Sequence, residues 1–403
     1  MTDRPDHDED SWGPSTTAIH HGYDPANAQG ALTPPIYMTS TYAFPDTEAG
    51  AAVFRGEAQG YVYGRRHNPT QTILEDRIAR LEGGAAAVAM ASGIACITTP
   101  MWTLLQAGDE VVIDHTLYGN TYAFFMQGLT RFGVKVTKVD MTRLDTLQAA
   151  LTARTRVVYF ETPANPNLRV IDIRAVSELA KRAAPEVLVV VDNTFCTPIL
   201  QRPLDHGADL VLHSATKFLS GHGDVLGGVL VGPADIIARV RNEGLRYLTG
   251  ATLSPMNAHL VLRGLKTLEI RMAQHSRSAT AVAQLLESHS AVERVFYPGL
   301  ESHPQFALAG RQMQASGGLI AFELRRGIEA GRKFMDRLRV VTLAVSLGDA
   351  ESLVQHPASM THANYTPEER AAQGICEGLV RLSIGLENTS DILADIEQAL
   401  GNL

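Results

Sequence analysis

The sequence predicts an α/β protein with a large, mostly parallel sheet and a second, smaller α/β domain. Between about residues 70 and 217, short apolar runs typical of strands alternate with longer runs of helical periodicity. The length of 403 residues exceeds that of one ordinary compact domain. A long helical pattern over residues 255–288 separates the alternating region from a second set of short strands and helices.

The first part of the chain, residues 15–66, is rich in Gly, Pro, Tyr and Thr and has poor periodicity. We expect an extended arm or loop region there, of a kind that packs on a neighbouring subunit. Helical periodicity starts after Thr70, which can cap a helix over residues 71–81 that stops at Gly83. The predicted divisions are an N-terminal arm over residues 1–66, a large domain over residues 67–258 and a C-terminal domain over residues 259–403.

The central region is predicted to alternate strands and helices. The expected strands cover residues 85–89, 110–113, 134–139, 157–161 and 187–191. The expected helices cover residues 93–105, 121–132, 144–151 and 173–184. Such alternation favours a mostly parallel sheet covered on both faces, in which ligands gather outside the carboxyl ends of the strands. In the C-terminal domain, strands are expected at residues 292–297, 318–324 and 379–386, and helices at 327–338 and 392–400.

Composition excludes several classes of function. The net charge of −8 and a pI of about 6.0 argue against nucleic acid and anionic membranes as partners. No apolar run approaches the roughly 20 residues of a membrane span, and the acidic N-terminus resembles neither a signal nor a transit peptide. Three scattered cysteines without a CxxC pair fit a reducing cytoplasm and predict no metal site.

Two chemically active residues follow predicted strands. Lys217 comes after an apolar run over residues 208–213 and a short polar turn, and Asp192 follows the run over residues 187–191. A pyridoxal phosphate (PLP) enzyme needs such a pair. The lysine holds the cofactor's aldehyde covalently, and the aspartate keeps the pyridine nitrogen protonated so that the ring can act as an electron sink. This reading predicts chemistry on amino acids.

A phosphate group also has candidate partners. Ser92, Gly93 and Ile94 lie between a strand and a helix, where backbone N–H groups can bind an anion, although an ordinary strand-to-helix turn has the same pattern. Ser214 and Thr216 add two hydroxyl groups beside the lysine, which makes a phosphate site more credible.

Four further residues each allow two interpretations. Tyr63 and Arg65 place a phenol and a guanidinium on one turn, where the arginine suits a phosphate or is a surface residue. Tyr118 can stack on a flat cofactor and move protons, or it is a turn residue beside glycine. Arg381 lies in an apolar strand and needs an anionic partner, which is either a structural carboxylate or the α-carboxylate of a substrate.

Other classes of protein fit less well. A nicotinamide oxidoreductase would share the alternating pattern, but the chain lacks the GxGxxG fingerprint, a Walker motif and a nucleophile elbow. A catalytically silent binding protein on the same scaffold would not need Lys217, Asp192, Tyr118 and Arg381 together. Absence of a visible cofactor absorbance would favour that alternative.

Taken together, these residues resemble the cystathionine/methionine-metabolism family of PLP enzymes, from about Thr17 to the C-terminus. The resemblance implies the type I fold of aminotransferase-like enzymes, with a mostly parallel, seven-stranded large domain, and a homotetramer built as a dimer of dimers. The motifs that carry it are Tyr63-Gly64-Arg65-Arg66-His67-Asn68-Pro69-Thr70, Ala91-Ser92-Gly93, Glu161-Thr162-Pro163-Ala164-Asn165-Pro166, Val191-Asp192-Asn193-Thr194, Ser214-Ala215-Thr216-Lys217, Val345-Ser346-Leu347-Gly348 and Val380-Arg381-Leu382-Ser383.

The resemblance also assigns roles to these residues. Tyr63 and Arg65 would reach the cofactor phosphate of the neighbouring subunit, whereas Ser92, Gly93, Ile94, Ser214 and Thr216 would bind it within their own chain. Asp192 would pair with the ring nitrogen, Tyr118 would stack on the ring, and Lys217 would bind the aldehyde. The substrate would be held by Ser346 and Arg381, with Asn165 and Tyr63 nearby.

Within the family, the amino-acid sequence is most similar to those of the methionine γ-lyases. This implies α,γ-elimination on L-methionine or a related sulfur amino acid, giving a 2-keto acid, ammonia and a thiol. Related cystathionine enzymes have a glutamate where this chain has Val345, and an uncharged thioether tail suits the position better. Typical methionine γ-lyases differ at three positions tied to methionine preference: Asn120, Arg246 and Tyr247. The alternatives are a cystathionine γ-lyase or a γ-replacement enzyme that joins a thiol to an O-acylhomoserine.

Overall fold

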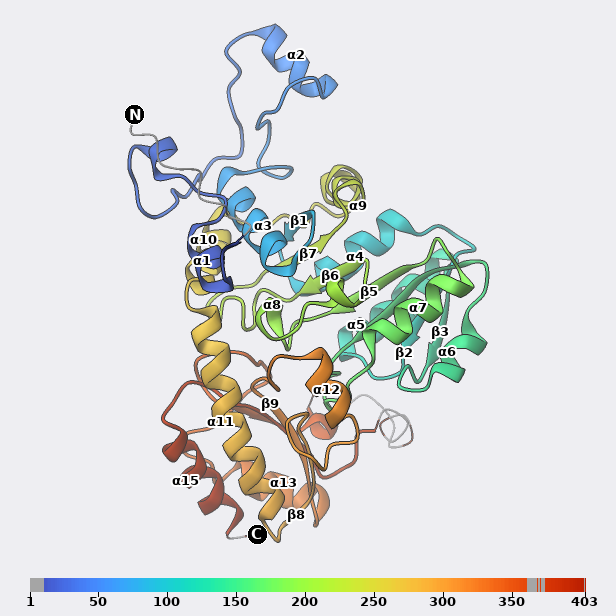
Figure 1. Cartoon of the computed structure of the whole chain (residues 1–403), viewed down its shortest axis with the longest axis vertical. Helices are drawn as coiled ribbons and strands as arrows, with labels where there is room; N and C mark the ends of the chain where they lie inside the picture. Colours follow the sequence, from blue (N-terminus) through green and yellow to red (C-terminus); the bar gives the residue numbers. More distant parts are fainter. Residues whose placement is uncertain (1–10, 361–367, 369, 371–373, 402) are drawn as a thin grey trace.

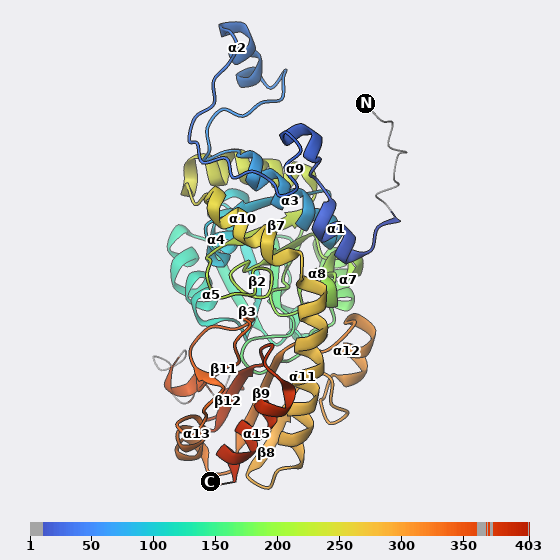
Figure 2. The same cartoon turned by 90° about the vertical axis from the view of Figure 1, so that its left-hand side faces the viewer.

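A computed structural model describes residues 11–360, 368, 370, 374–401 and 403. Two sheets dominate the chain, one of seven strands and one of five, each flanked by helices (Figures 1 and 2). The larger sheet precedes the smaller one in the sequence. The fold class that the sequence predicts is confirmed.

The seven-stranded sheet is mostly parallel. Only β7 runs against its neighbours β1 and β6, and the remaining strands pair in parallel. Parallel strands are buried on both faces, which explains their nearly continuous Val and Leu runs. The spatial order is β1 (Ala86–Met90), β7 (Gly228–Gly232), β6 (Leu210–His213), β5 (Leu188–Asp192), β4 (Thr155–Glu161), β2 (Glu110–Asp114) and β3 (Lys135–Val139).

Helices cover both faces of this sheet. The apolar sides of α6 (Leu144–Ala150) and α7 (Ile173–Ala183) pack on one face. The opposite face is covered by α4 (Gly93–Leu104) and the segment that follows β2. That segment was predicted as one helix over residues 121–132. It is helical without a break from residue 119 to 132, but it passes from an α-helix, α5 (Gly119–Ala123), through a π-helical turn, η3 (Phe124–Gly128), to a 3-10 turn, η4 (Leu129–Phe132).

Helix α3 (Pro69–Glu82) begins two residues before the predicted start. Asn68, not Thr70, is its N-cap, and the Asn68 side chain accepts a hydrogen bond from the Thr70 N–H at 2.9 Å. Proline at the first helical position is compatible with this start because that position needs no N–H partner. Gly83 ends the helix in the left-handed conformation, as the sequence predicts.

The long helical pattern over residues 255–288 is two helices rather than one. Helix α10 (Pro255–Leu265) packs on α3, and α11 (Leu268–Ser288) continues toward the smaller sheet (Figure 1). The break falls at residues 266–267, where the Arg271 guanidinium donates to the Gly264 carbonyl at 2.9 Å. The predicted division at residues 258/259 lies inside α10 and stays a prediction.

The smaller sheet packs against α11, α13 and α15 through a common apolar core. The sequence predicts three of its strands, whereas the short β10 and β11 were not expected. The third predicted strand ends at Ser383 instead of residue 386. In spatial order the strands are β10 (Thr342–Leu343), β11 (Leu353–Gln355), β12 (Leu379–Ser383), β9 (Leu319–Leu324) and β8 (Val292–Phe296), and the helices are α13 (Gly327–Met335) and α15 (Thr389–Leu400).

The N-terminal region is more helical than its composition predicts. Helix α1 (Pro14–His20) packs on α3, and α2 (Thr47–Arg55) projects away from the body of the chain (Figures 1 and 2). The expectation of an extended arm or loop is therefore wrong over these two helices. The remaining short elements are η2 (Pro25–Ala28), α8 (Thr197–Leu200), η5 (Pro203–His206), α9 (Ala234–Arg239), η6 (Val240–Thr249), α12 (Phe306–Gln312) and η7 (Pro357–Ser359).

None of the helices in the described part of the chain combines the length and the apolar character that crossing a bilayer requires.

Candidate active site

A cavity of about 240 Å³ lies at the carboxyl ends of β4, β5 and β6 and the N-terminus of α4. Its position is the one expected for ligands of an open, mostly parallel sheet. The smaller domain closes another side, because β12 supplies Arg381 and the loop between β10 and β11 supplies Val345 and Leu347. Twelve of the residues predicted from the sequence line it: Ser92, Gly93, Ile94, Tyr118, Asn120, Asn165, Asp192, Ser214, Thr216, Lys217, Val345 and Arg381.

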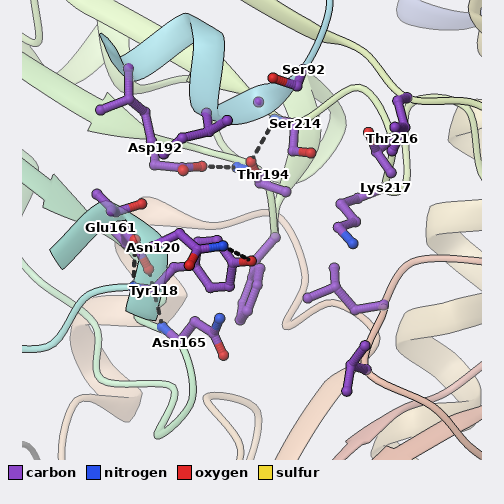
Figure 3. A pocket seen from close by; sticks show the side chains of 18 of the residues that line it. Ser92, Tyr118, Asn120, Glu161, Asn165, Asp192, Thr194, Ser214, Thr216 and Lys217 are labelled. Atoms are coloured by element: carbon purple, nitrogen blue, oxygen red, sulfur yellow. Dashed lines mark hydrogen bonds between the residues drawn. The ribbon is translucent and has the colours of Figure 1, made fainter. Parts of the chain in front are cut away.

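Lys217 and Asp192 approach this cavity from different sides (Figure 3). Asp192 is the last residue of β5, and its Oδ1 accepts the Thr194 N–H at 2.9 Å. Lys217 follows β6, and its Nζ donates to Ser346 Oγ at 2.9 Å. Burial and the nearby Arg381 lower the pKa of Lys217, while Asp349 opposes this shift. A lowered pKa makes the neutral amine, which is the form able to attack or accept a proton, more available near neutral pH.

The N-terminus of α4 forms a compact cup with the turn that precedes Lys217. Ser92 caps the helix by accepting the Ala95 N–H at 3.2 Å. A Cβ atom on Gly93 would lie 2.7 Å from Ser214 Cβ, so only glycine allows the two backbones to approach this closely. The Thr216 hydroxyl oxygen accepts a hydrogen bond from the Gly227 N–H at 3.1 Å. Helix N–H groups and hydroxyls are suitable partners for a phosphate.

Arg381 is buried and organises the smaller-domain side of the cavity. Its Nη1 donates to Asn165 Oδ1 at 2.8 Å, and its Nη2 donates to the Ser346 carbonyl at 2.9 Å. Its Nε has no hydrogen-bond partner among the described residues. Burial lowers the pKa of Arg381 to about 10, so the group stays cationic at neutral pH. The structure thus gives Arg381 no carboxylate ion pair within the described part of the chain, and it is free to meet an anionic ligand.

Tyr118 stands at the start of α5 with its ring beside the cavity (Figure 3). Its backbone N–H donates to Glu161 Oε1 at 2.9 Å. Its hydroxyl oxygen accepts the Asn120 amide at 2.9 Å. Because that bond uses an oxygen lone pair, the hydroxyl hydrogen remains available for a second partner.

These residues fit pyridoxal phosphate. The glycine-dependent cup of Gly93 and Ser214 can take an anionic phosphate, and Asp192 can pair with a protonated ring nitrogen. Lys217 supplies the amine for the aldehyde. The unpaired Nε of Arg381 leaves a donor for a carboxylate brought by the substrate.

Five predicted residues do not line the cavity within this chain. Ser346 does not line the cavity, but its hydroxyl accepts a hydrogen bond from Lys217, which does. Arg65 donates from Nη1 to the Arg246 carbonyl at 2.7 Å, and its guanidinium lies 5.3 Å from the centre of the Tyr63 ring. Tyr63 and Tyr247 are exposed. The expectation that Tyr63 and Arg65 serve a neighbouring subunit stays a prediction.

Sequence reasoning did not assign three residues that belong here. Glu161 lines the cavity beside Asp192, and its position at the end of a strand was the available signal. Thr194 accepts the Ser214 N–H at 2.8 Å and thereby joins the Asp192 turn to the Lys217 turn. Asp349 is buried and opposes the pKa shift of Lys217 from a loop distant in sequence, so no local pattern could identify it.

Asp114, His115 and Asp140 bring possible metal-ligand atoms within 4.8 Å of one another. The Arg169 guanidinium occupies the same place. It pairs with Asp140, and its Nη1 lies 2.9 Å from His115 Nε2 and 3.6 Å from Asp114 Oδ2. We therefore interpret Asp114, His115, Asp140 and Arg169 as an ion-pair network.

Comparison with known proteins gives consistent matches over nearly the whole chain. The family described as "Cys/Met metabolism PLP-dependent enzyme" matches residues 15–401. An L-methionine gamma-lyase from Pseudomonas putida is 56% identical over 96% of this chain and 97% of its own. A cystathionine gamma-synthase from Mycobacterium bovis is 44% identical over 96% and 97%. The crystal structure of MetB from Corynebacterium glutamicum superposes with a TM-score of 0.91 at 38% identity, covering 98% of this chain and 100% of that one.

Proposed function

This chain belongs to the family of PLP-dependent enzymes of cysteine and methionine metabolism, and we propose that it is a carbon–sulfur lyase. The reaction is α,γ-elimination on L-methionine or a related sulfur amino acid. With one water molecule, it releases a 2-keto acid, ammonia and a thiol. The observation that carries the proposal is that the Lys217 amine, the Asp192 carboxylate and the Arg381 guanidinium all reach one cavity.

The chain's own residues can hold the cofactor at both ends. Ser214 and Thr216, with the α4 N-terminus at Gly93, would bind the phosphate, and Asp192 would pair with the ring nitrogen. When bound, pyridoxal phosphate supplies an electron sink conjugated to the α-carbon of the substrate.

Arg381 and Lys217 then divide the work on the substrate. Arg381 binds the α-carboxylate, with Asn165 and the Ser346 carbonyl holding the guanidinium in place. The Lys217 amine takes the proton from Cα, returns it to the reacting molecule at another position, and is then free to take one from Cβ. Its resting contact with Ser346 Oγ holds it near the cavity between these transfers. Tyr118 donates the proton that the departing thiol requires, and each such transfer contributes about 10²–10⁴-fold.

The walls of the cavity favour an uncharged tail. Val345, Leu347 and Leu226 line it beside the polar Asn120. A second amino-acid head group, such as that of cystathionine, would leave charges without partners at a cost of about 1–3 kcal/mol per polar group. Methionine and homocysteine carry no such group.

A second candidate is γ-replacement, in which a thiol joins an O-acylhomoserine. It is supported by the 44% identity to a cystathionine gamma-synthase and by the Asn120 amide, which can bind an ester oxygen. Cystathionine γ-lyase activity is the third possibility within the same site.

We infer that the enzyme works as a homotetramer, a dimer of dimers, in the cytoplasm. In this arrangement Tyr63 and Arg65 would complete the phosphate site of a neighbouring subunit. Neither residue lines the cavity of its own chain, and Tyr63 is exposed, which supports this assignment. The free cysteines Cys96, Cys196 and Cys376 are compatible with a reducing compartment.

A substrate panel tests the proposed activity. Purified holoenzyme is incubated with methionine, homocysteine, cystathionine, and O-acetyl- and O-succinylhomoserine with and without sulfide, while keto acid, ammonia and thiol are measured. Methionine or homocysteine should give the highest kcat/KM for elimination. Preference for an acylhomoserine with sulfide would establish replacement instead. Lys217→Ala should abolish turnover of every substrate, and wild-type-like turnover by that variant would refute the assignment.

A further inference from the structure

Two carboxyl groups share the floor of the cavity. Glu161 and Asp192 end the neighbouring strands β4 and β5 and are direct partners in their parallel register. Neighbouring strands lie about 4.8 Å apart, so two side chains on the same face of such a pair are close. Both residues line the cavity, and Figure 3 shows them on the same side of it. Glu161 is only 5% exposed.

Their surroundings differ. Asp192 accepts the Thr194 N–H at 2.9 Å, and the Thr194 hydroxyl, His213 and the Tyr159 phenol also favour its charged form. Glu161 accepts backbone N–H groups from Tyr118 at 2.9 Å and from Asn165 at a long 3.5 Å. Among the described residues, no lysine, arginine or histidine side chain donates a hydrogen bond to Glu161.

The charges around Glu161 are mostly of its own sign. Asp192 faces it from β5 and Asp114 from β2. Neither Arg381 nor Arg169 donates to Glu161 in the described structure: Arg381 donates to Asn165, and Arg169 interacts with Asp114 and Asp140. Burial and then Asp192 raise the pKa of Glu161 well above its ordinary value. Burial also raises the pKa of Asp192, but three neighbouring residues, Thr194, His213 and Tyr159, oppose that shift.

Two adjacent carboxylates in a site of low dielectric cannot both ionise cheaply, and one of them keeps a proton. We propose that Glu161 is the protonated member, so that the floor of the cavity carries a single negative charge, on Asp192. This assignment rests on the proposed function in one respect: a cofactor ring nitrogen with one positive charge is matched by one carboxylate.

Glu161 is thus a positioning residue. Its Oε1 accepts the Tyr118 N–H and holds the start of α5, and with it the Tyr118 ring, against the end of β4. A neutral carboxyl does this without adding a second charge next to Asp192. An ionised Glu161 would compete with Asp192 for the cationic ring nitrogen.

The variant Glu161→Gln provides a test, because glutamine keeps the carbonyl acceptor but cannot ionise. In the unfolded chain Glu161 ionises above its ordinary pKa of about 4.3. If the folded protein keeps Glu161 protonated, folding at higher pH must take up a proton. The free energy of unfolding of the wild type therefore falls as pH rises. The unfolding midpoint of the Glu161→Gln holoenzyme should therefore exceed that of the wild type at pH 8, with the difference shrinking toward pH 5.

A buried, ion-paired glutamate serves as the matched control. Glu110 is 3% exposed and accepts hydrogen bonds from Thr152 at 2.8 Å, Lys135 at 3.3 Å and Arg154 at 3.0 Å, which lower its pKa. Glu110→Gln should therefore lower the unfolding midpoint at both pH values. Infrared spectroscopy provides the direct readout. The wild type at pH 7 should show a protonated-carboxyl band that is lost in Glu161→Gln and retained in Glu110→Gln.

The outcomes are distinct. A midpoint of Glu161→Gln below that of the wild type at pH 8, or a protonated-carboxyl band that survives the substitution, would overturn the assignment. Neither measurement depends on the substrate, so failure of the lyase assay would leave this result intact. In turnover, Glu161→Gln should keep the wild-type pH profile and cofactor absorbance, whereas Glu161→Ala should lower kcat because Tyr118 loses its anchor.

Discussion

Gly93 shows how one absent side chain shapes the site. The residue begins α4, and its Cα hydrogen faces Ser214 on the turn before Lys217. A methyl group there would lie 2.7 Å from Ser214 Cβ and 2.8 Å from its hydroxyl oxygen. The helix N-terminus and the hydroxyl-bearing turn would have to separate, and both are proposed partners of the phosphate.

Gly93→Ala should therefore weaken cofactor binding. Overpacking of this kind costs about 1–3 kcal/mol, and we expect a corresponding rise in the Kd for pyridoxal phosphate, measured by titration of the apoenzyme. Gly310→Ala is the control, because that glycine lies in α12 with open space around its Cα. It should leave the Kd unchanged, and equal Kd values for both variants would contradict the role of Gly93.

The charge of Lys217 is set by two opposing neighbours. Burial and Arg381 lower its pKa, whereas Asp349 raises it. Asp349→Asn removes the opposing charge, so the pKa of Lys217 should fall further. Covalent capture of the cofactor by the apoenzyme requires the neutral amine, and its rate should rise through a pH range lower in the variant than in the wild type. The exposed Glu351→Gln should leave that range unchanged, and an unshifted or upward-shifted range for Asp349→Asn would contradict the assignment.

At the scale of elements, α11 is hydrogen-bonded through Arg271 to the turn that carries Lys217. Arg271 is buried and donates to backbone carbonyls of Phe218 at 2.7 Å, Leu219 at 3.4 Å and Gly264 at 2.9 Å. It therefore joins three segments: the turn after β6, the end of α10 and the start of α11. Burial lowers the pKa of Arg271 to about 10, which still leaves it cationic at neutral pH.

Arg271→Met should destabilise the protein strongly. It would leave carbonyl groups without donors at a cost of about 1–3 kcal/mol each, and denaturant unfolding should show the loss. Arg277→Met on the exposed side of the same helix should change stability by less than about 0.5 kcal/mol. Comparable losses in both variants would show that the Arg271 contacts contribute little.

At the scale of the whole molecule, the N-terminal region looks incomplete in a single chain. Helix α2 projects from the body, and apolar side chains of the N-terminal region, including Met38 at 68% and Phe54 at 64%, are exposed. Exposed apolar surface of this extent is typical of an interface. Neither Tyr63 nor Arg65 lines the cavity of its own chain, and both observations support the proposal of active sites shared between subunits.

Subunit complementation tests this arrangement. Arg65→Ala and Lys217→Ala should each be inactive alone. After mixing, unfolding and refolding, hybrid dimers should regain activity, because one of their two sites then has both residues intact. Random pairing gives functional sites at about a quarter of the total. If activity does not return although hybrid oligomers form, Arg65 acts within its own chain.

Local patterns were sufficient to predict much of this protein. Strand-helix alternation predicted a mostly parallel sheet, and the strand-to-turn positions of Asp192 and Lys217 predicted where the cavity lies. These two predictions are correct because a buried strand and its carboxyl end are encoded by residues that are neighbours in the sequence. The boundaries near Asn68 and residues 266–267 were less predictable, because caps and buried arginine contacts decide where helices begin and end.

The sequence alone therefore determined the fold class, the family resemblance and most of the residues around the cavity. Only the tertiary structure decided that Glu161 stands in register with Asp192, that Ser346 receives the Lys217 amine and that Asp349 faces it. These relations join residues 31 to 132 positions apart, and they depend on strand order and domain packing. Desolvation and the sign of nearby charges follow from that packing, so no local pattern encodes which carboxyl group keeps its proton.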